Sequence, residues 1–219
     1  MRQLLLLRPE PGLSASAERA RQLGLKVIAC PLFRVEPVEW QAPDPANYDA
    51  LLLTSANAVR FGGAQLDTLK ALPVHAVGEA TAEAARSAGF EVASTGTGNV
   101  ADLLATLPIE LQLLHLAGYD HREAAGRKID RIIVYRSAAI DDPGIPVLDG
   151  LVVAVHSPRA AARLAELAGE RHRTPIAAIS EAAAEAAGPG WERIEVAEQP
   201  DDSSLLALAA MLCHTSPRQ

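Results

Sequence analysis

Aromatic side chains are scarce in this sequence: Phe, Trp and Tyr together make up 4% of the 219 residues. A surface that stacks nucleic-acid bases needs exposed rings, so we expect no nucleic-acid platform of that kind. Ala, Leu, Val and Ile must form the core instead, which favours helices packed on sheets. A chain of this length buries about 70% of its unfolded surface and needs no disulfide or metal to fold.

The sequence also has few cysteines, only short apolar runs, and fewer basic than acidic residues. Cys30 and Cys213 lie far apart and match no metal or redox spacing, so we expect reduced thiols and a cytoplasmic protein. The apolar run from Leu4 to Leu7 is too short for a signal peptide or a membrane span, and Arg8-Pro9 ends it. The formal net charge of −7 disfavours partnership with nucleic acid or an anionic membrane. An anion would therefore bind only at a local site.

Short apolar runs alternate along the chain with Ala-rich segments of helical spacing. Runs of this length are typical of strands buried on both faces, and alternation with helices implies parallel sheets. We therefore predict an α/β fold. The predicted strands include residues 4–7, 26–30, 51–53, 75–77, 113–116, 152–155 and 176–179.

An internal repeat predicts two similar halves. The segment from Pro73 to Ala85 returns 102 residues later as Pro175 to Ala187. At the same offset Ser55 falls on Ser157, and Asp102-Leu103-Leu104 falls on Ser204-Leu205-Leu206. Three segments in one register indicate two copies of one structural unit.

The N-terminal strand–helix–strand unit precedes the first copy and has no local partner, so we expect it to join the C-terminal half. The predicted architecture is two similar domains, each a parallel sheet flanked by helices, joined by a two-stranded linker. The first domain would comprise residues 1–35 and 142–219, the inserted domain residues 41–131, and the linker strands residues 36–40 and 132–141.

Hydroxyl groups and glycines follow the predicted strands, at the end of a parallel sheet where ligands bind. Helix N-termini there present free N–H groups and the positive end of the helix dipole. Capping alone is the alternative explanation for such residues. Their number, and the prospect of two domains that face each other, favour a ligand. The residues are Thr54, Ser55, Gly78, Thr81, Gly118, Ser157 and Ser180.

Stronger catalytic motifs are missing. There is no G-x-G-x-x-G fingerprint or P-loop lysine, and the histidines show no metal-ligand spacing. His75 and His115 lie on predicted buried strands, where we expect hydrogen-bonded core residues. His156 and Ser157 are adjacent on an extended strand, so their side chains point to opposite faces. We interpret Asp201-Asp202 as a solvated turn, not a metal site.

Tyr135 lies in the predicted crossing between the domains. Its hydroxyl is a candidate proton donor in the cleft. The alternative is a structural role, in which the ring of Tyr135 is buried against the strand and its hydroxyl is exposed to solvent.

Several short motifs, taken in order along the whole chain, resemble the uroporphyrinogen-III synthase family. They are Arg8-Pro9, Thr54-Ser55-Ala56-Asn57-Ala58-Val59, Val77-Gly78-Glu79-Ala80-Thr81-Ala82 with Gly89-Phe90, Val134-Tyr135-Arg136, and Ser157-Pro158-Arg159-Ala160-Ala161.

The resemblance implies closure of the linear tetrapyrrole hydroxymethylbilane to uroporphyrinogen III, with inversion of ring D, loss of water, and no metal or organic cofactor. It places this small-molecule substrate in the interdomain cleft, held by backbone N–H groups and hydroxyls. We expect the protein to be a monomer. Arg8 and Arg122 would bind its carboxylates, and Tyr135 matches the tyrosine that assists loss of the hydroxyl. Ser180 departs from the family, in which many members have glycine. The alternative function is a non-catalytic, hinge-type two-domain binding protein for a small anion.

Overall fold

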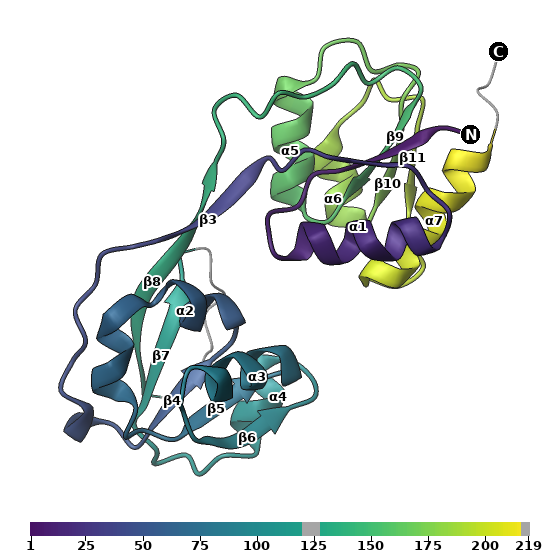
Figure 1. Ribbon diagram of the computed structural model, residues 1–219. Helices are drawn as coiled ribbons and strands as arrows, with labels where there is room; N and C mark the ends of the chain where they lie inside the picture. The colour runs from purple at the N-terminus through teal and green to yellow at the C-terminus, as the bar shows by residue number, and fades with distance from the viewer. Residues whose placement is uncertain (120–127, 216–219) are drawn as a thin grey trace. The chain divides into compact units, whose positions relative to one another are not determined.

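The computed structural model describes residues 1–119 and 128–215. The chain forms two compact units (Figure 1). One contains Met1–Arg34 and Ala139–Gln219, and the other contains Val35–Ala138.

The first unit is built on a five-stranded sheet in the order β11-β10-β9-β1-β2, in which every neighbouring pair is parallel. Its three central strands are buried, as their continuous apolar sequences require. The strands are β1 (Gln3–Leu6), β2 (Val27–Ala29), β9 (Leu151–Val155), β10 (Pro175–Ala178) and β11 (Arg193–Val196).

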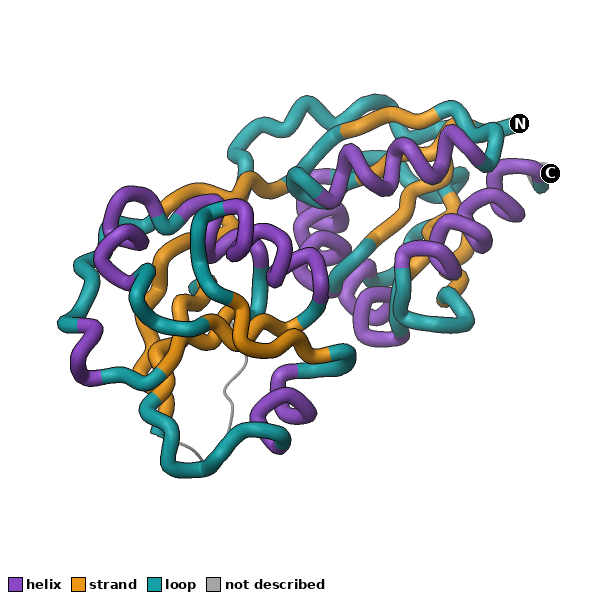
Figure 2. The backbone as a smooth tube through the Cα atoms, turned by 60° about the horizontal axis from the view of Figure 1, so that its bottom comes forward, coloured by secondary structure: helices purple, strands orange, loops and turns teal. Residues whose placement is uncertain are grey.

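Helices cover both faces of this sheet. Side chains of α1 and α7 pack on one face, against Leu4, Leu6 and Val152. Side chains of α5 and α6 pack on the other face, against residues such as Leu5 and Val153. Figure 2 shows helices flanking the strands in this unit. The bounds are α1 (Gly12–Gln22), α5 (Pro158–Leu167), α6 (Glu181–Ala187) and α7 (Asp202–His214).

The second unit is built on a six-stranded sheet in the order β3-β8-β7-β4-β5-β6. The pairs from β8 through β6 are parallel. The strands are β3 (Phe33–Pro37), β4 (Ala50–Leu53), β5 (Val74–Val77), β6 (Val92–Gly96), β7 (Leu113–Gly118) and β8 (Ile129–Ala139).

Helical segments also pack on both faces of the second sheet. One face is covered by α2, η2 and α3, whose apolar side chains meet Leu51, Leu53 and Leu116. On the other face, Leu103 and Leu104 of α4 pack near Leu52. The bounds are α2 (Ala56–Phe61), α3 (Glu79–Ser87), α4 (Val100–Ala105), and the 3-10 helices η1 (Pro45–Asn47) and η2 (Gly63–Leu69). The predicted α/β class with helix-flanked parallel sheets is confirmed.

The internal repeat is visible in the starts of three helix pairs. Ser55 caps α2 and Ser157 caps α5, Glu79 opens α3 and Glu181 opens α6, and Asn99 caps α4 and Asp201 caps α7. Each pair is separated by the 102-residue offset found in the sequence. The two copies therefore share the starts of these helices, whereas the helices end at different positions.

The chain passes between the units along β3 and β8, which are neighbours in the second sheet. Val38 N–H donates to the carbonyl of Val134, and Arg136 Nε donates to Glu36 Oε1 at 2.6 Å. β3 begins at Phe33, ahead of the strand expected at 36–40, and β8 begins at Ile129, ahead of the strand expected at 132–141. The earlier start of β8 follows from its parallel pairing with β7, which makes it part of the sheet.

Candidate active site

The predicted site residues gather at the carboxyl ends of neighbouring strands within each unit. In the first unit Arg8, Ser157 and Ser180 follow β1, β9 and β10, which are adjacent. In the second unit the strands β8, β7, β4 and β5 are adjacent. Five predicted residues lie at or just after the ends of β7, β4 and β5, namely Gly118, Thr54, Ser55, Gly78 and Thr81. Tyr135 lies within β8, opposite Gly118 at the end of β7. Each unit thus presents one edge rich in hydroxyls and glycines.

Three of the predicted serines are helix N-caps. Ser55 Oγ accepts from the N–H of Asn57 at 3.2 Å, Ser157 Oγ accepts from Ala160 at 3.2 Å, and Ser180 Oγ accepts from Ala183 at 3.3 Å. The capping explanation is therefore correct for these oxygens. A hydroxyl that accepts a bond still has its proton to donate, so capping and ligand binding are compatible.

Gly78 occupies a backbone conformation that favours glycine, with φ of 86°. Its N–H donates to the carbonyl of Gly96 at 3.1 Å, and the N–H of Thr81 donates back to Gly78. Thr81 is only 5% exposed. Both N–H groups are thus used within the unit. At the equivalent position in the other copy, Ser180 has extended backbone and caps with its side chain.

Thr54 is held by a buried histidine. Its Oγ1 lies 3.0 Å from Nε2 of His115, whose ring is on β7 and 4% exposed. Nε of Arg131 lies 3.5 Å from the other ring nitrogen, Nδ1. The hydrogen bond between His115 and Thr54 therefore fixes the position of the Thr54 hydroxyl at the end of β4. The expectation that His75 and His115 are hydrogen-bonded core residues is confirmed, since His75 Nδ1 lies 2.7 Å from Ser94 Oγ.

Tyr135 and Gly118 are in direct contact. They are register partners on β8 and β7, and the N–H of Tyr119 donates to the carbonyl of Tyr135 at 3.0 Å. A β-carbon at Gly118 would lie 2.6 Å from two ring carbons of Tyr135. The ring therefore lies across the glycine. Within residues 1–119 and 128–215, the Tyr135 hydroxyl has no hydrogen-bond partner.

Arg8 does not stand alone at the edge of its sheet. Its Nη1 donates to Ser16 Oγ at 2.9 Å and to Asp202 Oδ1 at 3.1 Å. Asp202 also accepts from Ser16 at 2.6 Å, from His156 Nε2 at 2.8 Å, and from Arg19. We call these five residues the Asp202 cluster. Arg122, the other arginine predicted to bind substrate, lies outside the described residues.

Interpreting Asp202 as part of a solvated turn was wrong. The side chain of Asp202, the first residue of α7, is 16% exposed because α7 packs beside α1, which supplies Ser16 and Arg19. Burial alone would raise the pKa of Asp202, but hydrogen bonds from Ser16, His156 and Arg19 lower it below the usual value. Sequence reasoning missed this cluster because its members are separated by up to 194 residues and share no motif.

The pKa of His156 is lowered, chiefly by burial and also by the neighbouring charge of Arg8. Its imidazole is therefore neutral at neutral pH, with Nε2–H directed at the carboxylate of Asp202. His156 is thus tied to the Asp202 cluster and not to Ser157.

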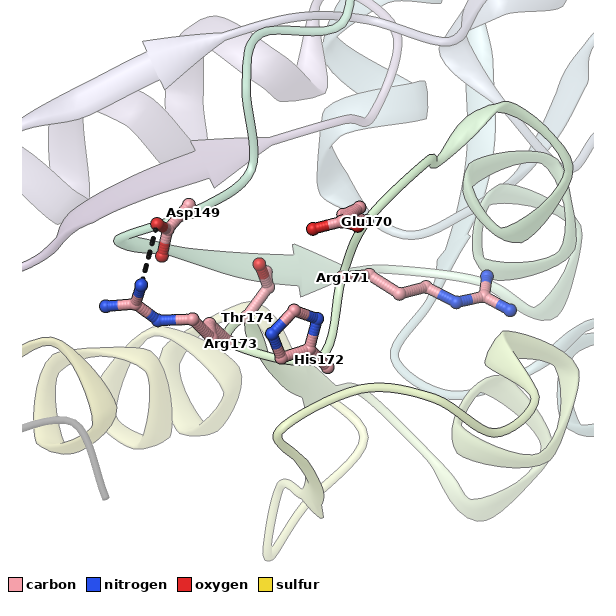
Figure 3. A pocket seen from close by; sticks show the side chains of 6 residues that line it. All are labelled: Asp149, Glu170, Arg171, His172, Arg173 and Thr174. Carbon is pink, nitrogen blue, oxygen red and sulfur yellow. Dashed lines mark ion pairs between the residues drawn. The ribbon is translucent and has the colours of Figure 1, made fainter. Parts of the chain in front are cut away.

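A separate cavity of about 180 Å³ lies at the opposite, amino end of β9 and β10 (Figure 3). An ion pair between Arg173 and Asp149 at 3.3 Å spans part of it. Thr174 donates to the carbonyl of Leu148, so its hydroxyl proton is already used. Parallel sheets bind ligands at the carboxyl end, so we do not assign a substrate to this cavity. Its lining residues are Asp149, Glu170, Arg171, His172, Arg173 and Thr174.

A model of the family described as uroporphyrinogen-III synthase HemD matches residues 14–207. The chain belongs to this family. Its fold resembles that of a uroporphyrinogen-III synthetase from Helicobacter pylori, with a TM-score of 0.68 at 18% identity, covering 97% of this chain and 100% of that one. It also resembles a mutant uroporphyrinogen III synthase from the extremely thermophilic bacterium Thermus thermophilus, with a TM-score of 0.51 at 18% identity, covering 96% and 99%. No curated protein matches the sequence.

The two structural matches support the fold of a uroporphyrinogen-III synthase over nearly the full length of the chain. In the part of the chain that the structure describes, no group of three or more His, Cys, Asp or Glu residues is placed to hold a metal ion. Among the same residues, no helix has both the length and the apolar character needed to cross a bilayer.

Proposed function

We propose that the residues at the carboxyl ends of the two sheets carry out the reaction of the family to which the chain belongs. The chain is a lyase that closes hydroxymethylbilane to uroporphyrinogen III, with inversion of ring D and loss of water. This is a step of tetrapyrrole and heme biosynthesis. The family match over residues 14–207 carries this conclusion, and it does not favour the alternative of a non-catalytic binding protein.

Substrate binding is proposed to rest on local donors. The tetrapyrrole carries eight carboxylates, whereas the chain has a net charge of −7, so its overall field opposes binding. A charge-assisted hydrogen bond contributes about 1.5–3 kcal/mol where water is excluded. The proposed donors are Arg8, Arg122 and the hydroxyls of Thr54, Ser55, Thr81, Ser157 and Ser180, with backbone contacts at Gly78 and Gly118. Because the Gly78 N–H is already used, a contact at that residue would be close approach of the substrate to its bare Cα.

Tyr135 is proposed as the general acid. Its ring is fixed against Gly118, its hydroxyl has no partner among the described residues, and an ordinary phenol is protonated at neutral pH. The electron-rich pyrrole expels the substrate hydroxyl as the phenol protonates it, so the C–O bond breaks and water leaves. The resulting azafulvene-type cation is then attacked by the substituted carbon of ring D. The bond from that carbon to the methylene bridge of ring C breaks and re-forms at the unsubstituted α-carbon of ring D, which inverts the ring. The proton lost from this α-carbon restores the phenol. Holding ring D in place is mostly a positioning effect, worth several kcal/mol.

The proposal extends to the compartment in which the protein works and to the roles of its two units. Cys30 and Cys213 are both buried, and we propose that they are reduced thiols in the cell. We propose a cytoplasmic monomer whose two units act as the two domains of the enzyme, with the linker strands near 36–40 and 132–141.

The test is a coupled isomer assay. Hydroxymethylbilane is generated in place, and the type I and type III products are separated after oxidation. The wild type should yield the type III isomer, whereas the spontaneous product is type I. Tyr135→Phe should slow single-turnover formation of the type III isomer by about 10²-fold, with little change in KM.

Tyr119→Phe is the matched control, because Tyr119 adjoins Gly118 but is 70% exposed. It should leave the rate unchanged. A wild type that yields only the type I isomer would refute the function. A Tyr135→Phe rate within about twofold of the wild type would leave Tyr135 a structural residue.

A further inference from the structure

The guanidinium of Arg8 is held by hydrogen bonds at only one of its three nitrogens. Nη1 is engaged by Ser16 and Asp202, whereas Nε and Nη2 have no partner among the described residues. The Arg8 side chain is 31% exposed, so part of it is accessible to a ligand. Nε and Nη2 form the planar fork that binds a carboxylate through two parallel hydrogen bonds.

Gly12 makes this placement of Arg8 possible. A β-carbon at this position would lie 2.5 Å from Nε and 2.7 Å from Nη2 of Arg8. The guanidinium therefore lies against the bare Cα of Gly12, at the start of α1. The three atoms nearest to that β-carbon all belong to Arg8, so an alanine here would displace the end of the Arg8 side chain.

The Asp202 cluster keeps a net positive charge. It contains two guanidiniums, of Arg8 and Arg19, but only one carboxylate, that of Asp202. The imidazole of His156 is neutral because burial lowers its pKa. One unit of positive charge therefore remains to attract an anion. The attraction of both arginines to the Asp202 carboxylate offsets the repulsion between them.

We propose that Asp202 and Ser16 are positioning residues that hold Arg8 by Nη1, so that its Nε–Nη2 fork binds one carboxylate of the tetrapyrrole substrate. Gly12 provides the space, and Arg19 and His156 hold Asp202 in turn. This inference rests on the proposed function. It assigns Arg8 to a bidentate carboxylate contact and adds Gly12, Ser16 and Asp202 to the binding machinery.

The experiment measures KM and kcat in the isomer assay, together with the Kd of uroporphyrin III, a stable octacarboxylate, from porphyrin fluorescence anisotropy. Arg8→Gln should raise KM and Kd by about 10-fold to 150-fold, the equivalent of one strong charge-assisted contact, with kcat within about twofold. KM should also rise, by about threefold to tenfold or more, in each of the variants Gly12→Ala, Ser16→Ala and Asp202→Asn.

The decisive comparison is made in the Arg8→Gln background. If the positioning residues act through Arg8, Gly12→Ala and Ser16→Ala should have no further effect on KM or Kd there. Ser14→Ala is the matched control on the same helix, because Ser14 bonds Glu10 and not Arg8. It should leave both constants unchanged. Circular dichroism identifies any variant that does not fold, and if Asp202→Asn is one of these, Gly12→Ala and Ser16→Ala still carry the test.

Two outcomes would overturn the inference. One is a normal KM and Kd for Arg8→Gln. The other is an equal rise in KM for Gly12→Ala and Ser16→Ala with or without Arg8. Neither outcome affects the proposed function, provided that the wild type makes the type III isomer. Loss of that isomer in the wild type would refute the function, and the uroporphyrin III titration would still decide whether Arg8 binds carboxylate.

Discussion

Replacing Gly118 with alanine should damage catalysis through Tyr135. A β-carbon at Gly118 would lie 2.6 Å from Cε2 and Cζ of Tyr135 and 2.8 Å from its hydroxyl oxygen. Ordinary contact begins near 3.4 Å, so the ring must move by about 0.8 Å. Misplacing a reacting group by about 1 Å can cost about 10²-fold in rate. We therefore expect Gly118→Ala to slow single-turnover formation of the type III isomer by about that factor.

The backbone itself should accept the substitution. Gly118 is not among the described glycines with positive φ, so alanine introduces no backbone strain there. Overpacking against the ring should cost about 1–3 kcal/mol of unfolding free energy, which leaves a folded protein to assay. Gly169→Ala is the matched control, because a β-carbon there meets nothing within 4 Å and its φ is also not positive. It should leave the rate unchanged.

The double variant separates catalysis from general damage. If Gly118 matters only because it positions the Tyr135 hydroxyl, Gly118→Ala should slow Tyr135→Phe by less than about twofold, since that hydroxyl is already missing. A Gly118→Ala rate within twofold of the wild type would refute the reasoning. So would an unchanged 10²-fold loss in the Tyr135→Phe background.

Two further predictions concern stability. Arg2 and Glu192 form a 2.7 Å ion pair whose side chains are 7% and 9% exposed. Glu192→Gln should therefore lower the free energy of unfolding, measured in urea, by about 3–5 kcal/mol, whereas the double variant Arg2→Met/Glu192→Leu should lose much less. Equal losses would contradict the view that the single variant is destabilised by an unpaired buried charge. Burial lowers the pKa values of His156 and His75 in the native state. As the pH is lowered, the imidazoles of the unfolded chain, which titrate near pH 6.5, therefore bind protons at a higher pH than the native ones do. The urea concentration at the unfolding midpoint should fall as the pH drops below about 6.5. His156→Asn should flatten that fall, and an equally steep profile in the variant would contradict the role given to His156, whose ring faces Asp202 and Arg8.

Local signals in the sequence were sufficient for the helix starts. Ser157-Pro158 and Asn99 cap helices through bonds to N–H groups two or three residues away, so neighbouring residues determine these boundaries. The repeat aligned Ser55 with Ser157, and Ser55 is also a cap, whereas Asp201, which we interpreted as part of a solvated turn, proved to cap α7. Continuous apolar runs gave the central strands because those strands are buried on both faces.

The edge strands were harder to predict for a physical reason. β6 and β11 are only half-buried, so their sequences, Val-Ala-Ser-Thr-Gly and Arg-Ile-Glu-Val, lack the continuous apolar character of the central strands. The starts of β3 and β8 depend on pairing in the six-stranded sheet, which no local motif encodes. Their positions therefore differ from the predicted linker strands by about three residues.

The candidate site divides in the same way. Serines that cap helices could be found because a cap is a local structure, but the partner of Arg8 could not, since it lies 194 residues away on α7.

The difference between local caps and long-range contacts bears on how an acidic chain binds an octacarboxylate. The sequence suggests isolated arginines and hydroxyls, whereas the structure shows hydroxyl oxygens already used as caps and Arg8 held by a carboxylate of the chain itself. The donors that we propose for the substrate are therefore the groups that internal hydrogen bonds leave over: the hydroxyl protons of the capping serines, the Thr54 hydroxyl positioned by His115, and the Nε–Nη2 fork of Arg8. Such donors are few but are fixed before the substrate arrives, so little ordering cost is incurred on binding. Selectivity for a tetrapyrrole would then come from the spacing of pre-oriented donors rather than from net charge.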